Sequence, residues 1–242
     1  MNIYTKSLAA VALLGAVTAP GIATALEDIS ANASLATNYV FRGVSQTDNK
    51  AAIQGGFDWG YDFEPVRWYV GAWGSNIDSD FFADDPVMEL DLYTGVSGDF
   101  GDFGYDVGWL RYFYPTGSIN NTSEWHAGGS WKWFGATVYY SKDWFATDES
   151  AGRIEGTFDY DLPYGIGFSA GVANNYGDGN DDIWSDSYVD WSIGVSKTWL
   201  GVDWGLAYTD TNIDQTDCKA VSASNDDDIC DANFTLSLSK SF

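Results

Sequence analysis

The chain of 242 residues contains one histidine, His126, and therefore one imidazole that could act as a catalytic base near neutral pH. A serine hydrolase needs such a base beside a nucleophilic hydroxyl. Nothing in the sequence brings a particular serine to His126, which lies between Glu124 and Gly128 in a two-residue alternation. We therefore expect no enzyme, no catalytic residue and no cofactor, and we expect His126 to be a hydrogen-bonded structural residue.

Two cysteines, Cys218 and Cys230, lie in one polar and acidic stretch. In an oxidising compartment two nearby cysteines usually form a disulfide, and closing so short a loop typically contributes about 2–4 kcal/mol. A metal site is not expected, because there is no Cys-x-x-Cys spacing and His126 is far away in the sequence. We predict a Cys218–Cys230 disulfide.

Two acidic clusters carry oxygen ligands of the kind that Ca²⁺ and Mg²⁺ prefer. Neither has the spacing of a recognised calcium loop, and solvated surface charge is the alternative reading. The clusters are Asp178, Asn180, Asp181 and Asp182, and Asp226, Asp227 and Asp228.

Acidic residues dominate the charge of the chain, with 35 Asp and Glu against 11 Lys and Arg and a formal charge of −24. This excess excludes a nucleic-acid partner, because nucleic-acid binding depends on a basic surface. Cations and small hydrophilic solutes are the expected ligands.

The segments that carry these side chains show a two-residue rhythm typical of β-strands. In the last segment Phe234, Leu236 and Leu238 share one face, and the residues between them are small and polar. One face suits lipid and the other suits water. A closed barrel satisfies this pattern in a membrane, because no sheet edge is left unpaired.

The N-terminus has the features of a secretion signal. Lys6 precedes an apolar run, and Ala23-Thr24-Ala25 offers a cleavage point. We predict that residues 1–25 are a signal peptide and that residues 26–242 form the barrel. Removing the signal takes away only Lys6 among the charged residues, so the formal charge becomes −25. No later segment is apolar enough for a spanning helix, so the chain would cross a membrane as strands.

Alternation and turn residues together predict twelve strands, the even number typical of bacterial barrels. Their connections alternate between short turns, expected in the periplasm, and longer acidic loops, expected outside the cell. The predicted strands are 32–44, 50–62, 66–76, 87–98, 102–113, 122–133, 135–145, 151–161, 164–175, 186–198, 201–211 and 231–242.

A soluble β-sandwich would also alternate, but the aromatic residues favour the barrel. They make up 17% of the chain, and most tryptophans share the apolar face of their strands, often near turns, as in an interfacial girdle. We predict an all-β fold, a transmembrane antiparallel up-and-down barrel of about twelve strands in the bacterial outer membrane. Its partners would be outer-membrane lipid and lipopolysaccharide, the latter bridged by divalent cations at the acidic loops.

The same parity predicts which charged side chains face the lumen. Apart from His126, four are positive and ten are negative, so some must pair and the rest would favour cations. The predicted set is Arg42, Asp58, Arg67, Glu89, Asp91, Asp106, Glu124, His126, Lys132, Asp143, Arg153, Glu155, Asp159, Asp190 and Asp203.

Three cations break the parity. Arg111, Lys142 and Lys240 would point toward lipid in this register. A long side chain near a strand end can reach the headgroups, but Arg111 could also mark a bulge that shifts its strand by one residue.

Several segments resemble the bacterial Gcw_chp family, also called TorF-type porins. They are Asn38–Thr47, Ala52–Gly56, Tyr69–Asn76, Glu89–Gly95, Tyr105–Gly108 and Tyr114-Pro115. The resemblance implies an outer-membrane barrel with a porin role, and it supplies no substrate and no catalytic residue.

We therefore predict a porin-like channel that gives small solutes a narrow, cation-favouring path. The alternative is a closed structural or surface-interaction barrel, because twelve strands enclose a lumen that side chains such as Tyr69, Tyr93 and Tyr112 could fill.

Overall fold

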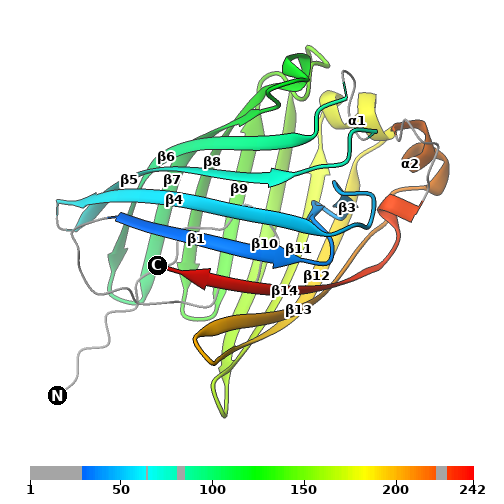
Figure 1. Ribbon diagram of the computed structural model, residues 1–242. Helices are drawn as coiled ribbons and strands as arrows, with labels where there is room; N and C mark the ends of the chain where they lie inside the picture. The colour runs from blue at the N-terminus through cyan, green and yellow to red at the C-terminus, as the bar shows by residue number, and fades with distance from the viewer. Residues whose placement is uncertain (1–28, 64, 81–84, 222–227) are drawn as a thin grey trace, which may run out of the picture.

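Twelve antiparallel strands close into a barrel in the computed structural model (Figure 1). The structure describes residues 29–63, 65–80, 85–221 and 228–242, so the predicted signal peptide lies outside the described residues. The first strand closes the ring by pairing with both the last strand and the next barrel strand. The barrel strands are β1 (Ile29–Ala36), β4 (Ala52–Asp62), β5 (Val66–Asn76), β6 (Met88–Phe100), β7 (Phe103–Phe113), β8 (Thr122–Trp131), β9 (Phe134–Ser141), β10 (Ala151–Leu162), β11 (Ile166–Tyr176), β12 (Tyr188–Trp199), β13 (Val202–Thr211) and β14 (Asn233–Ser241).

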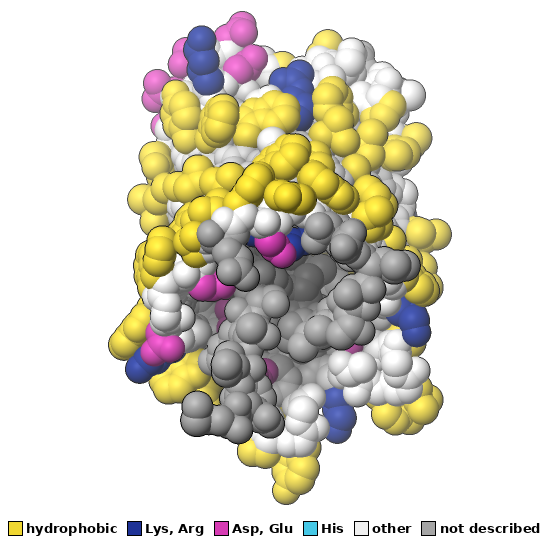
Figure 2. Space-filling view, turned by 90° about the vertical axis from the view of Figure 1, so that its left-hand side faces the viewer, with side chains coloured by type: hydrophobic (Ala, Val, Ile, Leu, Met, Phe, Trp, Pro, Cys, Tyr) yellow, Lys and Arg dark blue, Asp and Glu magenta, His cyan; other side chains and the backbone are white. Residues whose placement is uncertain are grey.

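The two-residue rhythm becomes an apolar outside and a polar inside. On β4, Ile53 is 70% exposed on the outer wall, whereas its neighbour Gln54 is 9% exposed inside. Hydrophobic side chains cover the outer wall at the short-turn end of the barrel, and acidic side chains are visible inside its mouth (Figure 2). This is the wall expected where lipid surrounds a barrel that encloses polar groups. The predicted fold class is confirmed.

Short turns and long connections lie at opposite ends. The β12–β13 turn consists of Leu200 and Gly201, both with positive φ, as a two-residue type I′ hairpin requires. The longer connections carry η1 (Ser118–Asn120), α1 (Asp178–Trp184), α2 (Gln215–Val221) and η2 (Asp228–Cys230). Among the described residues no helix is long and apolar enough to span a bilayer.

The predicted disulfide is present. Cys218 on α2 is bonded to Cys230 on η2, within the connection between β13 and β14. Both cysteines are buried with Val44, Trp184 and Tyr188. The bond therefore stabilises a connection that packs against the barrel interior.

The first predicted strand, 32–44, is wrong beyond Ala36. The chain leaves the wall there and forms a separate hairpin of β2 (Val40–Phe41) and β3 (Val44–Ser45). The Asn38 side chain holds the base of this hairpin, since its Oδ1 accepts hydrogen bonds from the hydroxyls of Ser45 and Thr47. Alternation continues through both parts, so it could not reveal where the wall ends.

Two further strand ends were predicted too far along the chain. β8 ends at Trp131, so Lys132 lies in the following turn, exposed and with its ammonium 4.5 Å from the Trp131 ring centroid. β9 ends at Ser141, so Lys142 and Asp143 lie in a loop. The inward positions predicted for Lys132 and Asp143 are therefore wrong.

The suspected bulge at Arg111 is absent. Arg111 pairs in unbroken register with Leu92 on β6 and with Ser123 on β8. The Arg111 side chain therefore stays on the face that the alternation predicts. Its guanidinium donates a hydrogen bond to the Ser123 hydroxyl at 3.0 Å and lies over the Phe113 ring.

Candidate functional site in the lumen

The β2–β3 hairpin lies inside the ring of strands, toward the end that carries α1 and α2 (Figure 1). Its tip consists of Arg42 and Gly43, with φ of +52° and +86°. A Cβ on Gly43 would lie 2.8 Å from the Thr211 Cβ and 3.0 Å from the Asp190 Cβ. The tip therefore lies against β12 and β13, and only glycine fits both the backbone angle and the space.

Arg42 reaches from this tip to β8. Its Nη2 lies 2.7 Å from both carboxylate oxygens of Glu124, and the two side chains are only 6% and 2% exposed. The Tyr112 hydroxyl donates a further hydrogen bond to Glu124 at 3.1 Å. The Arg42 guanidinium also lies 5.5 Å from the Tyr139 ring centroid and 4.8 Å from that of Trp144. The cation is thus held by one carboxylate and by aromatic faces.

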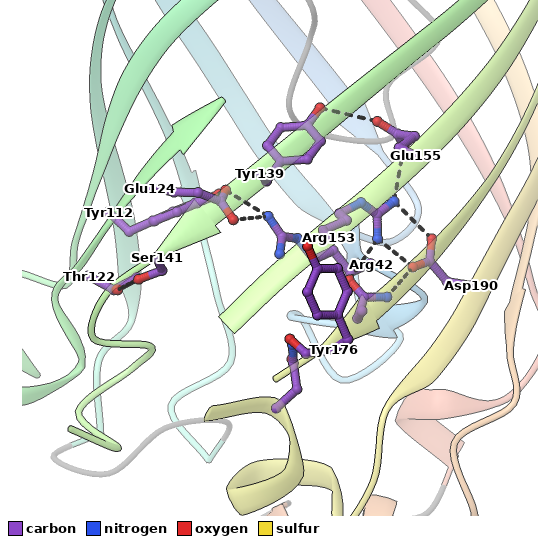
Figure 3. A network of polar contacts seen from close by, with 12 residues as sticks. Arg42, Tyr112, Thr122, Glu124, Tyr139, Ser141, Arg153, Glu155, Tyr176 and Asp190 are labelled. Carbon is purple, nitrogen blue, oxygen red and sulfur yellow. Dashed lines mark hydrogen bonds and ion pairs between the residues drawn. The ribbon is translucent and has the colours of Figure 1, made fainter. Parts of the chain in front are cut away.

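A second buried arginine, Arg153 on β10, lies beside the first (Figure 3). It forms ion pairs with Asp190 and with Glu155, the latter at 2.9 Å, and it donates to the Asn175 side chain at 3.0 Å. The Tyr139 hydroxyl donates to Glu155 at 3.1 Å. Tyr139 therefore joins the two arginine clusters, with its ring against one and its hydroxyl on the other.

Aromatic side chains fill the space on the other side of the hairpin. Tyr39 packs edge-on against Trp73 of β5, with ring centroids 5.5 Å apart, and Phe41 packs against Tyr112 of β7 at 5.8 Å. Leu110 and Tyr114 complete a buried cluster. The hairpin is therefore packed into the lumen.

Two neighbouring acids on β6, Glu89 and Asp91, lie under this cluster and are each 2% exposed. The Tyr39 hydroxyl is 3.2 Å from both carboxylate oxygens of Glu89. Asp91 Oδ1 has no hydrogen-bond partner among the described residues. Within the part of the chain that the structure describes, neither carboxylate is paired with a cation.

His126 belongs to another lumen cluster. Its Nε2 is hydrogen-bonded to Asp106, and the Tyr69 hydroxyl donates to the same Asp106 oxygen at 3.0 Å. Asp106 and Tyr69 are therefore the neighbours of the His126 Nε2 among the described residues.

The remaining predicted residues lie nearer the short-turn end. Asp58 accepts from the Tyr93 hydroxyl at 2.6 Å, and Asp203 accepts from Thr198 at 2.5 Å. Arg67 pairs with Asp62 at 2.9 Å, both side chains being well exposed. Asp159 on β10 is also exposed. The structure thus brings Arg42, Glu124, Arg153, Glu155 and Asp190 together, and it leaves Asp58, Arg67, Asp159 and Asp203 apart from that group.

Sequence reasoning missed the aromatic half of the site, including Tyr39, Phe41, Tyr139 and Trp144. One available signal was Arg42-Gly43 between Val40-Phe41 and Val44-Ser45, which has the spacing of a two-residue hairpin.

The acidic segment 178–182, one of the two clusters considered for Ca²⁺ or Mg²⁺, folds into α1, where the Asn180 side-chain amide donates to the Tyr176 carbonyl. Asp226 and Asp227 lie outside the described residues. Among the described residues no group of three or more His, Cys, Asp or Glu side chains is arranged to hold a metal.

Solved structures of porins share the fold at low sequence identity. The KdgM porin superposes with a TM-score of 0.50 at 10% identity, covering 88% of this chain and 99% of the porin. The NanC porin gives 0.52 at 9% identity, covering 87% and 97%. A chain from a study of in-meso crystallisation of membrane proteins gives 0.54 at 12% identity, covering 88% and 83%. This likeness concerns the fold alone.

The sequence itself matches one family model. Residues 22–242 match Gcw_chp, described as a bacterial protein of unknown function. No protein in a search of curated sequences matches.

Proposed function

Because the chain belongs to the bacterial Gcw_chp family and folds as a porin-like outer-membrane barrel, we propose that it gives small solutes a narrow, cation-favouring path. The observation that carries this proposal is the charge balance of the lumen. The buried arginines are each neutralised by carboxylates, and the buried neighbours Glu89 and Asp91 cannot both carry a charge without a cation. Asp58, Asp159 and Asp203 are more accessible and form no ion pair among the described residues. These unpaired lumen carboxylates would attract cations and repel anions.

The narrowness of the path follows from the hairpin. The tip at Gly43 touches Thr211 and Asp190, while Tyr39 and Phe41 pack against the opposite side of the lumen. A solute would therefore pass beside the β2–β3 hairpin or would require it to move.

A closed structural or surface-interaction barrel is the second candidate. The same hairpin favours it, since its aromatic and ionic contacts are well packed. The apolar outer wall suits lipid in either case. The acidic loops would bind lipopolysaccharide through divalent cations.

Conductance in a planar bilayer under a salt gradient tests the proposal. We expect stepwise currents whose reversal potential has the sign that shows cations to be more permeant than anions. A folded barrel that gives no current would favour the closed barrel, and currents with anion preference would overturn the charge argument.

A further inference from the structure

The group around the Arg42 guanidinium has the composition of a binding site for an organic cation. Glu124 supplies a carboxylate from β8, Tyr139 supplies a ring from β9, and Trp144 supplies a ring from the β9–β10 connection. A third ring, Phe41, lies 4.9 Å away and belongs to the hairpin itself. Three of the four contacts thus come from the barrel, independently of the segment that carries Arg42.

The chemistry of this group discriminates among cations. The carboxylate accepts hydrogen bonds from N–H donors, and an aromatic face attracts a weakly hydrated, planar guanidinium. A small hydrated metal ion cannot stack on the rings and would be stripped of water. The Tyr112 hydroxyl donates to Glu124, which fixes the carboxylate in place. The site therefore suits guanidinium or amine headgroups better than Na⁺.

Arg42, which fills this group of side chains, lies at the tip of a short hairpin. The β2–β3 hairpin has two residues in each strand and pairs with no barrel strand. Its other attachments are side-chain and loop contacts, such as that of Tyr39 with Glu89. Arg42 can thus leave the site without breaking the barrel ladder.

We propose that Glu124, Tyr139 and Trp144 form a recognition site for a guanidinium or small amine solute, which Arg42 occupies as a tethered competitor. This assignment rests on the proposed cation path, because solutes must enter the lumen to reach the site. A tethered group acts at a high effective concentration, so an external cation binds the wild-type chain weakly. Removing the Arg42 side chain unmasks the site.

Arg42→Ala with methylguanidinium chloride as the probe tests the assignment. In the detergent-folded variant, millimolar methylguanidinium is expected to raise Tm saturably, by roughly 3–6 °C at a tenfold excess over Kd, while equal NaCl does not. The wild-type chain should shift much less. The double variant Arg42→Ala/Glu124→Gln should lose the shift. No shift in Arg42→Ala beyond NaCl, or an equal shift in the double variant, would overturn the proposal.

If Arg42→Ala does not fold alone, refolding yield replaces Tm as the readout. Methylguanidinium during refolding should restore the heat-modifiable band of the barrel on gels, and failure to exceed the NaCl yield overturns the assignment. Bilayer currents distinguish failure of the proposed cation path from failure of the proposed recognition site. Probe binding without conductance would defeat the cation path alone, and cation-selective currents without probe binding would defeat the recognition site alone.

Discussion

Arg42 and Glu124 are 82 positions apart in the sequence and form a buried ion pair, with the Arg42 Nη2 2.7 Å from each carboxylate oxygen. The pair links the inward hairpin to the wall at β8. Because both side chains are buried, this contact matters more to the hairpin than an exposed pair would.

Breaking this pair is expected to destabilise the barrel and release the hairpin. Arg42→Ala leaves the Glu124 carboxylate buried without its cation, which costs about 3–5 kcal/mol. Urea unfolding should show this loss, and the double variant Arg42→Ala/Glu124→Gln should recover part of it. Arg67→Ala, in a largely exposed pair with Asp62, is the control and should cost much less. Equal losses in the two single variants would contradict the structural role given to Arg42.

Gly43→Ala should displace the hairpin tip from the wall. The new Cβ would clash with Thr211 and Asp190 at a positive φ, at a cost of about 1–3 kcal/mol. We expect a lower Tm and a larger or noisier single-channel conductance. Gly101→Ala is the matched control, because Gly101 also has a positive φ but a Cβ there meets nothing within 4 Å. The same conductance change in both variants would show that the clash is irrelevant.

Neutralising accessible lumen acids should weaken cation preference. Asp159→Asn/Asp203→Asn removes two lumen carboxylates that form no ion pair among the described residues, without changing their size. We expect the cation-to-anion permeability ratio to fall about fivefold, as an interaction of ~1 kcal/mol implies. Reversal potentials under a salt gradient measure this ratio. Asp102→Asn, in the β6–β7 turn, is the control. An unchanged ratio in the double variant would remove these acids from the selectivity argument.

Acidification should loosen the contact between two outer loops. Burial opposes ionisation of Asp78, but the Asp80 backbone N–H and the Lys50 ammonium, each 3.0 Å away, outweigh it and lower the pKa of Asp78. A carboxyl group with a lowered folded pKa stabilises the fold fully above its unfolded pKa, near ~3.9, and loses that effect as pH falls through the folded pKa.

The stability that the Asp78 carboxylate contributes is therefore constant between about pH 5 and 8. A small loss of stability is expected below about pH 4. Asp78→Asn should have a slightly lower Tm than the wild type at pH 7, and the gap should close at low pH. Thermal melts across this range measure it. A constant gap at every pH would mean that the Asp78 charge is not involved.

The sequence by itself determined the barrel, because a period of two is a local property of each strand. Leu236 and Ser237 must face opposite sides wherever β14 lies, and lipid outside with polar groups inside permits one orientation. The lumen positions of Glu89, Asp106 and Glu124 follow from the same rule. The Cys218–Cys230 bond followed from the short spacing of the only two cysteines.

Only the tertiary structure decided what those lumen groups do. Tyr39 and Phe41 lie two positions apart like apolar wall residues, yet they belong to a hairpin segment that hydrogen bonds to the Asn38 side chain hold inside the barrel. The partner of Arg42 depends on which wall the tip reaches, and alternation carries no information about distant pairs. The cation site around Glu124 therefore arises from packing across the lumen, a relationship that no local pattern encodes.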